Sequence, residues 1–199
     1  MSSSATNNSA SGEGEAAADD SRAFDGPDYM KIDPTEMFSS AILASHAVFG
    51  PLMESNLIER FNIYKKINTT ITSVQLEEQQ QFNGHEEVMV VDVQIGSRLN
   101  AHVGIVHGGI ISLLFDTSLG YACANLIKGY AKDAIALTAN LKVDFRAPFP
   151  EKSAAVLRVY LDKVERSKLF LSAVLQDTDG SVTYAEAASL FIKRKLSAM

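Results

Sequence analysis

The hydrophobic pattern changes along the chain, and each change marks a different kind of structure. Residues 1–30 hold Ser, Ala, Gly, Asn and acidic residues with almost no large apolar side chains, so we expect a disordered acidic tail. Residues 31–62 carry apolar side chains that predict an N-terminal helical segment, whose first helix ends at Gly50-Pro51. Residues 63–199 follow a different pattern and form the predicted main domain.

Most of residues 63–199 alternates apolar and polar positions in the manner of β-strands. Asn83-Gly84 separates the first two of these segments and predicts a tight hairpin turn. Further turn signals divide the last four segments from one another. The six predicted strands are Tyr64–Phe82, Glu87–Gly96, Ala134–Arg146, Ala154–Val164, Leu169–Gln176 and Thr183–Lys193.

One long apolar stretch interrupts the predicted strands. Residues 108–127 show little period-two alternation and no proline, and their length favours a buried helix. The predicted order is therefore two strands, one long helix and four strands. This order predicts an α+β fold in which a mostly antiparallel sheet wraps around a single central helix.

The formal net charge of −6 belongs mainly to the tail. Of the 24 acidic and 18 basic residues, six acids and one base lie in residues 1–30, which leaves 18 acids and 17 bases in the remainder. The predicted folded part is therefore nearly neutral. Because it has no basic excess to release counterions from a phosphate backbone, we expect no nucleic-acid partner.

The cellular location is inferred from cysteine content and from the N-terminus. A single cysteine, Cys123, cannot form an internal disulfide, and the chain lacks a Cys/His zinc pattern. The apolar runs are shorter than the about 18–20 residues that span a bilayer, so we expect no integral membrane segment. No secretory signal is evident, and the acidic N-terminus disfavours a mitochondrial location. We expect a cytoplasmic protein, with mitochondria as the alternative.

The start of the predicted helix carries candidate chemistry. Gly108 and Gly109 follow His107, so their N–H groups can approach a ligand without obstruction by side chains. A helix N-terminus with free donors stabilises a developing oxyanion. The same glycines would also allow close packing of the helix on its sheet, and the residues alone leave both interpretations open.

Asp116 lies in the apolar part of the same predicted helix. At helical spacing its face carries Gly109, Ser112 and Gly120, which are small and leave space around the carboxylate. A carboxylate in such surroundings needs polar partners or a raised pKa, and a raised pKa makes a general base. The alternative is a structural Asp that is hydrogen-bonded to the backbone.

The spacing of these groups predicts an oligomer. Asp116 follows Gly108 by eight residues, which is roughly 12 Å along a helix. This separation is too long for both groups of one chain to act on one carbonyl. The enzyme hypothesis therefore requires a homodimer, or a dimer of dimers, in which two chains build each site.

His107-Gly108-Gly109 followed by Asp116 resembles the helix-start motif of hotdog-fold acyl-CoA thioesterases of the PaaI-like group. Three further motifs are similar to the long-chain acyl-CoA thioesterases of the thioesterase superfamily member type. They are Leu137-Thr138-Ala-Asn140-Leu-Lys-Val-Asp144-Phe-Arg146-Ala-Pro148, Leu161-Asp-Lys-Val-Glu165 and Tyr184-Ala-Glu-Ala-Ala-Ser-Leu-Phe-Ile192. The matching motifs lie within residues 87–193.

The resemblance implies hydrolysis of fatty acyl-CoA, of medium to long chain length, without a metal or redox cofactor. It implies that Asp116 is the general base or nucleophile and that Thr138 orients the attacking water. The Gly108 N–H, with His107 beside it, would form the oxyanion hole. Arg and Lys side chains suit the phosphates of coenzyme A. The residues expected to bind substrate are Gly109, Ser112, Asp144, Arg146, Arg166 and Lys168.

Two positions depart from the family pattern. Relatives usually carry Gly-Pro-type residues before the motif, whereas this chain has Asn100-Ala-His-Val. Their basic residue at the predicted turn after Glu165 is replaced by Ser167. These departures affect the oxyanion loop and the coenzyme A site.

Other functions remain as alternatives. The main one is a non-catalytic acyl-CoA-binding or scaffold protein that keeps the hotdog fold. A metal site formed by His102, His107 and Asp116 is a weaker one. Hydratases of this fold carry an Asp and a His five residues apart, a spacing that His102 and His107 do not have with any Asp. His46 and His85 have no evident partners, so we interpret them as structural or surface residues.

Overall fold

The computed structural model describes residues 24, 26–36, 38–69, 82–127, 130, 132 and 134–196. Most of the predicted acidic tail, residues 1–23, lies outside the described residues. The end of the tail is folded, because Phe24 is buried and residues 29 and 30 belong to the first strand. The folded region therefore starts before the predicted boundary at residue 30.

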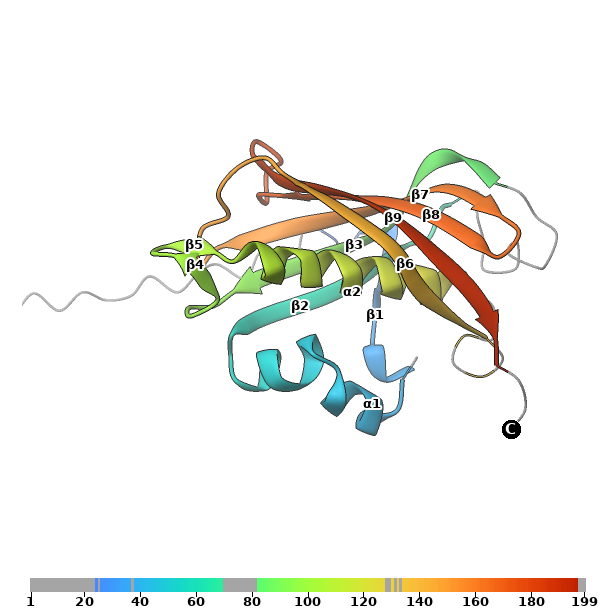
Figure 1. The fold of residues 1–199 in the computed structure, drawn as a ribbon, viewed down its shortest axis with the longest axis horizontal. Helices are drawn as coiled ribbons and strands as arrows, with labels where there is room; N and C mark the ends of the chain where they lie inside the picture. Colours follow the sequence, from blue (N-terminus) through green and yellow to red (C-terminus); the bar gives the residue numbers. More distant parts are fainter. Residues whose placement is uncertain are drawn as a thin grey trace, which may run out of the picture.

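A seven-stranded sheet forms the body of the molecule (Figure 1). Its strand order is β1-β2-β3-β7-β8-β9-β6, and every pair of neighbours is antiparallel. The four strands predicted after the central helix are present, with ends within two residues of those predicted. The strands are β1 (Tyr29–Ile32), β2 (Ile58–Lys66), β3 (Phe82–Ile95), β6 (Ala134–Phe145), β7 (Ala154–Glu165), β8 (Lys168–Gln176) and β9 (Thr183–Lys195).

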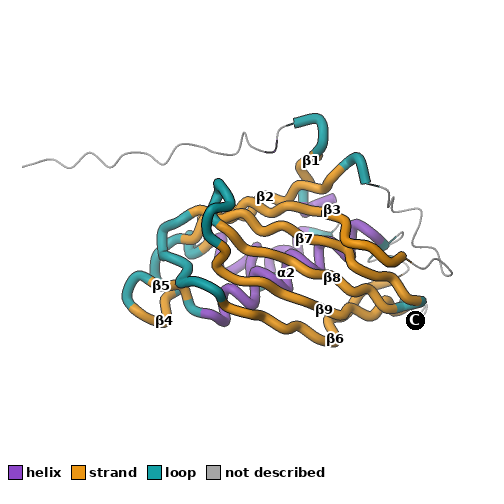
Figure 2. Tube along the Cα trace, turned by 90° about the horizontal axis from the view of Figure 1, so that it is seen from above, coloured by secondary structure: helices purple, strands orange, loops and turns teal. Residues whose placement is uncertain are grey.

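The predicted central helix is α2 (Gly108–Leu126), and the sheet curves over it (Figure 2). Strand alternation directs every second side chain of β7 toward α2. Leu157 and Leu161 of β7 thus share one core cluster with Phe115 of α2, and all three are fully buried. Each such side chain contributes about 1.5–3 kcal/mol to folding. The arrangement confirms the hotdog fold that the resemblance implies.

Helix α2 is also long and apolar enough to cross a membrane by length and composition alone. It has 19 residues, and a window of 18 of them has a mean hydropathy of 1.2. Within the fold, however, 61% of this window is buried. The hydropathy of α2 therefore reflects its place in the core beneath the sheet.

The hairpin predicted at Asn83-Gly84 is wrong. Strand β3 runs through both residues, and Asn83 lies opposite Lys163 of β7. Register irregularities after Asn83 and after Glu87 absorb the residues of poor strand propensity. Pairing with β7 thus overrides the local turn preference. Strands β2 and β3 do pair with each other, but residues 70–81 between them lie outside the described residues.

A short helical layer lies between β1 and β2 in the sequence and beside α2 in space (Figure 1). Its first helix, α1, ends at Ser45 and not at Gly50-Pro51 as predicted, and a separate π-type turn runs through both of those residues. Gly50 serves close packing instead, since a Cβ atom there would collide with the Ala44 carbonyl oxygen. Strand β2 also crosses the predicted boundary between residues 62 and 63. The elements of this layer are η2 (Pro34–Glu36), α1 (Ser40–Ser45) and η3 (Val48–Leu52).

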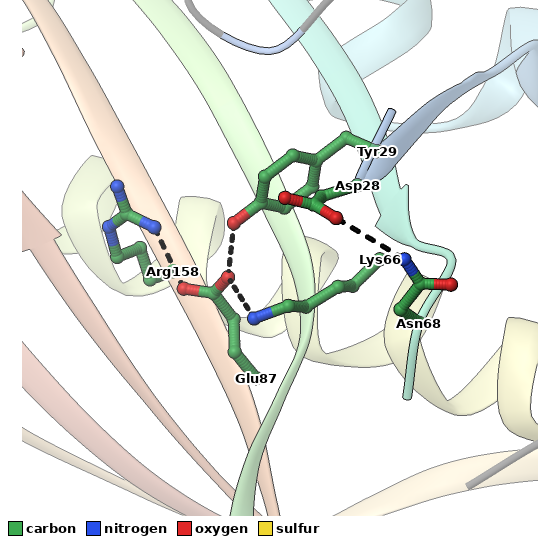
Figure 3. A network of polar contacts seen from close by, with 6 residues as sticks. All are labelled: Asp28, Tyr29, Lys66, Asn68, Glu87 and Arg158. Carbon is green, nitrogen blue, oxygen red and sulfur yellow. Dashed lines mark hydrogen bonds and ion pairs between the residues drawn. The ribbon is translucent and has the colours of Figure 1, made fainter. Parts of the chain in front are cut away.

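The face of the sheet opposite α2 carries a polar network that fixes β1 (Figure 3). Glu87 accepts hydrogen bonds from Tyr29 at 2.5 Å and from Arg158 at 2.8 Å, and Lys66 lies 3.5 Å away. The Phe24 ring lies 5.9 Å from the Arg158 guanidinium. Burial favours a higher pKa for Glu87, but the hydrogen bonds and positive charges around it hold the pKa below its usual value. Burial and the Glu87 carboxylate together raise the pKa of Tyr29 to about 12.

Candidate active site

The start of α2 gives its two glycine amides different roles. His107 is the N-cap residue, and its Nδ1 accepts a hydrogen bond from the Gly109 N–H at 2.8 Å. The neutral His107 ring therefore carries its proton on Nε2. The Gly108 N–H, at the first helical position, meets no acceptor within the described part of the chain. One amide at the positive end of the helix dipole is thus left for a ligand.

A cavity of about 360 Å³ opens beside this amide. A small hairpin of β4 (Asn100–His102) and β5 (Ile105–Val106) forms one wall, and the segment at the end of β6 forms another. The Phe145 ring covers Gly108, since a Cβ atom on Gly108 would lie 3.1 Å from Phe145 Cζ. Most of the lining is apolar, including Ile105, Val106, Ile111, Ala147, Pro148 and Phe149.

Asp116 and Thr138 are in direct contact. The Thr138 hydroxyl donates a hydrogen bond to Asp116 Oδ1 at 2.8 Å. The register of β6 shifts between Thr138 and Asn140 where it pairs with β9, and an irregularity of this kind re-aims side chains. Asp116 is half-buried, so its carboxylate keeps an open side. The structure thus brings together the two residues expected to act on water.

A single chain does not bring Asp116 to the Gly108 amide. Both residues lie on the uninterrupted helix α2, eight residues or roughly 12 Å apart. Asp116 is accordingly absent from the lining of the cavity beside Gly108. A carbonyl group bound at the Gly108 amide is therefore out of reach of Asp116 in the same chain.

The small residues near Asp116 are partly used by the helix itself. The Ser112 hydroxyl donates to the Gly108 carbonyl oxygen at 3.0 Å, and the Gly109 amide is capped by His107. A substrate would have to compete with the Gly108 carbonyl group for the Ser112 hydroxyl. Gly120 faces Phe191, because a Cβ atom there would lie 3.9 Å from the Phe191 ring.

Two of the expected coenzyme A contacts lie at the end of β6 that borders the cavity. Arg146 lines the cavity and donates two hydrogen bonds to Glu186 Oε2, at 2.6 and 2.9 Å. The bonded Glu186 carboxylate raises the pKa of Arg146, and the bonded Lys142 ammonium lowers the pKa of Asp144. All four charges are paired on the surface, so an incoming phosphate would displace Glu186 from Arg146.

The other two expected contacts lie at the opposite end of the sheet. Arg166, with a φ of 57°, occupies the β7–β8 turn, and Lys168 begins β8. Lys168 and Leu137 both lie opposite Ile192 of β9. From Leu137 to Phe145 is eight residues, or roughly 25 Å along a strand. Within one chain, Arg166 and Lys168 are therefore far from the cavity.

The two histidines interpreted as lacking partners both have them. The His46 ring lies 5.3 Å from the Phe49 ring, and burial lowers its pKa against an opposing effect of the Asp116 charge. His85 Nδ1 lies 2.6 Å from Asp162 Oδ1. The carboxylate that acts on each histidine is at least 70 residues away in the sequence, so a sequence pattern does not reveal it.

Sequence reasoning missed the cavity wall. It did not single out Phe145 or Phe149, and it considered His102 only for the metal and hydratase alternatives. The position of His102 depends on Ile105, which forms an isolated bridge with Pro150 and so brings the hairpin beside the helix start. The segment Asn100-Ala-His-Val, which departs from the family pattern, was the available signal for this wall. Its location could not be predicted, because it depends on non-local pairing.

Metal and thiol chemistry gain no support from the side chains. Among the residues that the structure describes, no group of three or more His, Cys, Asp and Glu could hold a metal ion. The alternative site formed by His102, His107 and Asp116 is therefore not assembled in the chain. Burial raises the pKa of the Cys123 thiol, which keeps it protonated and unreactive.

The candidate residues from His107 to Lys168 lie within a segment that is similar to known proteins. Residues 103–184 match the family model described as the thioesterase superfamily. The chain is 37% identical over 112 residues to acyl-coenzyme A thioesterase THEM4 of Rattus norvegicus. The aligned residues cover 56% of this chain and 46% of that protein. It is 30% identical over 129 residues to acyl-coenzyme A thioesterase THEM5 of Mus musculus. Here the aligned residues cover 62% of this chain and 50% of that protein.

The fold has a counterpart among solved structures. A thioesterase family protein of Silicibacter pomeroyi matches with a TM-score of 0.51 and 21% identity, covering 73% of this chain and 90% of the other. This likeness concerns the fold alone. The chain spans about half the length of the two curated relatives named above.

Proposed function

We propose that this chain is an acyl-CoA thioesterase, because residues 103–184 match the family model of the thioesterase superfamily. It hydrolyses fatty acyl-CoA, of medium to long chain length, to free fatty acid and coenzyme A. The observation that carries the proposal is the hydrogen bond between Thr138 and Asp116, which prepares a half-buried carboxylate to hold a water molecule. The names of the two curated relatives support the same substrate class.

Asp116 acts as the general base in this mechanism, and direct nucleophilic attack by its carboxylate is the alternative route. The Thr138 hydroxyl donates to the carboxylate and its lone pairs can accept from water, so it orients the attacking molecule. Asp116 removes a proton from the water as the oxygen adds to the carbonyl carbon. The Gly108 N–H donates to the carbonyl oxygen as that oxygen becomes negative. His107 supports this arrangement by capping the next amide.

The two halves of the site come together in a homodimer or a dimer of dimers. Strand β6 is an edge strand of the sheet, and it exposes 53% of Leu137 and 54% of Phe145. Long apolar edge strands are avoided in stable monomers, which supports coverage of this edge by a second copy. An antiparallel pairing of two β6 strands sets the Ala134 end of one opposite the Phe145 end of the other. Asp116 of the second copy then approaches the Gly108 amide.

The same pairing explains how separated basic residues could bind one coenzyme. The β7–β8 turn lies at the Ala134 end of β6, so Arg166 and Lys168 of the second copy approach the cavity that Arg146 lines. Guanidinium and ammonium groups suit the phosphates of coenzyme A. Asp144, Gly109 and Ser112 would border the bound substrate. The mechanism needs no metal or redox cofactor, and the proposed location is the cytoplasm, with mitochondria as the alternative.

The test is turnover of acyl-CoAs of graded chain length, measured by thiol release. The wild type should release coenzyme A, and Asp116→Asn should lower kcat by about 100-fold or more, because general-base catalysis contributes at least that much. Substrate affinity and the native mass should be unchanged. Asp33→Asn, on an exposed loop, is the control and should keep full activity. Binding of acyl-CoA by the wild type without thiol release would support the scaffold alternative.

A further inference from the structure

His102 occupies a defined place beside the proposed oxyanion site. The β4–β5 hairpin that carries it turns at Gly104, whose φ is +77°, and the hairpin is fixed at its base. There the His107 N–H donates to the Leu99 carbonyl at 2.7 Å, and the Val106 N–H donates to the Phe149 carbonyl at 2.9 Å. His102 therefore lines the same cavity as Gly108, although five residues lie between them in the sequence.

The two histidines near the helix start differ in their hydrogen bonds. Nδ1 of His107 is occupied by the Gly109 amide, so this ring is held in place as a cap. The His102 ring is exposed and makes no side-chain hydrogen bond within the described residues. Histidine is the side chain whose ordinary pKa allows it to give and take a proton near neutral pH. His102 is thus the imidazole of this cavity whose ring nitrogens are not used by the hairpin or the helix within the described residues.

The proposed reaction needs a proton at this location. The base, Asp116 of the second copy, serves the attacking water, and the Gly108 N–H serves the carbonyl oxygen. Neither group serves the sulfur atom, which leaves as the thiolate of an alkyl thiol. A free alkyl thiol has a pKa of about 8.5, so a donor at neutral pH assists its departure.

Resting on the proposed function, we propose that His102 is the general acid that protonates the departing sulfur of coenzyme A. Water first loses a proton to Asp116, and its oxygen adds to the thioester carbon to give an oxyanion at the Gly108 N–H. The oxyanion electron pair then re-forms the C=O bond, and the C–S bond breaks with its electron pair on sulfur. That pair takes the proton of the His102 imidazolium. Solvent returns a proton to His102 and removes one from Asp116, so thioester and water give carboxylic acid and thiol.

The test compares two substrates with the same acyl group, the coenzyme A thioester and the thioester of 4-nitrothiophenol. The aromatic thiolate is stabilised by its ring and leaves without a proton. His102→Gln should lower kcat on acyl-CoA by about 100-fold and should change kcat on the nitrothiophenyl ester by no more than about twofold. Asp116→Asn should lower kcat on both substrates, because attack by water is common to both.

His85→Gln, on the opposite face of the sheet, is the matched histidine control and should change neither rate. Thermal unfolding of each variant checks that the fold is intact. An equal loss on both substrates for His102→Gln would overturn the general-acid role, and so would the absence of a loss on acyl-CoA. A wild type that turns over neither substrate would overturn the proposed function itself.

Discussion

At the residue scale, the candidate site depends on how a few polar groups are paired at the start and middle of α2. His107 caps Gly109, and this leaves the Gly108 amide without an acceptor in the described part of the chain. The Thr138 hydroxyl donates to one oxygen of Asp116, and the other oxygen is the one proposed to hold water. A preorganised donor or acceptor of this kind is worth more in a partly dry site than in water.

The role of Thr138 can be separated from its size. Thr138→Val keeps the shape but removes the hydroxyl, so kcat should fall by about 10- to 100-fold, the equivalent of losing a hydrogen bond to a charged group. Thr138→Ser keeps the hydroxyl and should retain most of the activity. Steady-state kinetics on one acyl-CoA substrate measures both variants. Equal rates for the Val and Ser variants would show that the hydroxyl does not take part.

The sequence indicated some of these residues for physical reasons and missed others. Asp116 stands out because a carboxylate in an apolar helix with small neighbours is a strong local signal. Thr138 has no such signal, since its position depends on an irregularity in β6, and only the family resemblance pointed to it. The N-cap bond of His107 could not be foreseen, because it is set by the backbone conformation.

At the element scale, predictions succeeded where a segment's own pattern decides its structure. The apolar stretch 108–127 forms a helix because its length and uniform hydropathy suit no other buried element. The prediction at Asn83-Gly84 failed because pairing of β3 with β7 outweighs the local preference for a turn. Burial of Phe24 was likewise not foreseen, since its neighbours in the cluster, Tyr64 and Val156, are distant in sequence.

The Glu87 network should make the attachment of β1 sensitive to acid. Its pKa is lower in the folded state than the unfolded value of about 4.3, so its contribution to stability is present above that pH and is lost as pH falls through the folded pKa. Glu87→Gln should lower the free energy of unfolding at pH 7 by about 2 kcal/mol. Denaturant unfolding at several pH values should show this difference shrinking below about pH 4.

A second carboxylate serves as the control for this experiment. Glu165 lies 3.5 Å from Lys163, and both side chains are 45% exposed. Exposed ion pairs contribute little to stability, so Glu165→Gln should have almost no effect at any pH. A constant difference between wild type and Glu87→Gln from pH 7 down to pH 3 would mean that the Glu87 charge is not what stabilises the network.

At the scale of the whole molecule, a composite site predicts that two inactive chains can restore one another. Asp116→Asn removes the base, and Gly108→Val places a branched side chain against Phe145 at the carbonyl site. A heterodimer of these two variants keeps one site with both wild-type groups. Purified by two different tags, it should have about half of the wild-type activity per dimer.

The outcome for a site contained in one chain is different. Each chain of the heterodimer would then carry its own defect, and the heterodimer would be as inactive as either homodimer. Native mass spectrometry of the same sample confirms that both variants are present in one particle. An inactive heterodimer of correct mass would contradict the composite site.

The burial of α2 has a consequence for the synthesis of the protein. The four strands β6 to β9, which provide much of its cover, all follow it in the sequence. Sixty-nine residues separate the end of α2 at Leu126 from the end of β9 at Lys195. At about 5–20 residues per second, the ribosome needs roughly 3–14 s to add them. During that time, the apolar surface of α2 is not yet covered by these four strands. The yield of folded protein therefore depends on how well the nascent chain is protected from aggregation.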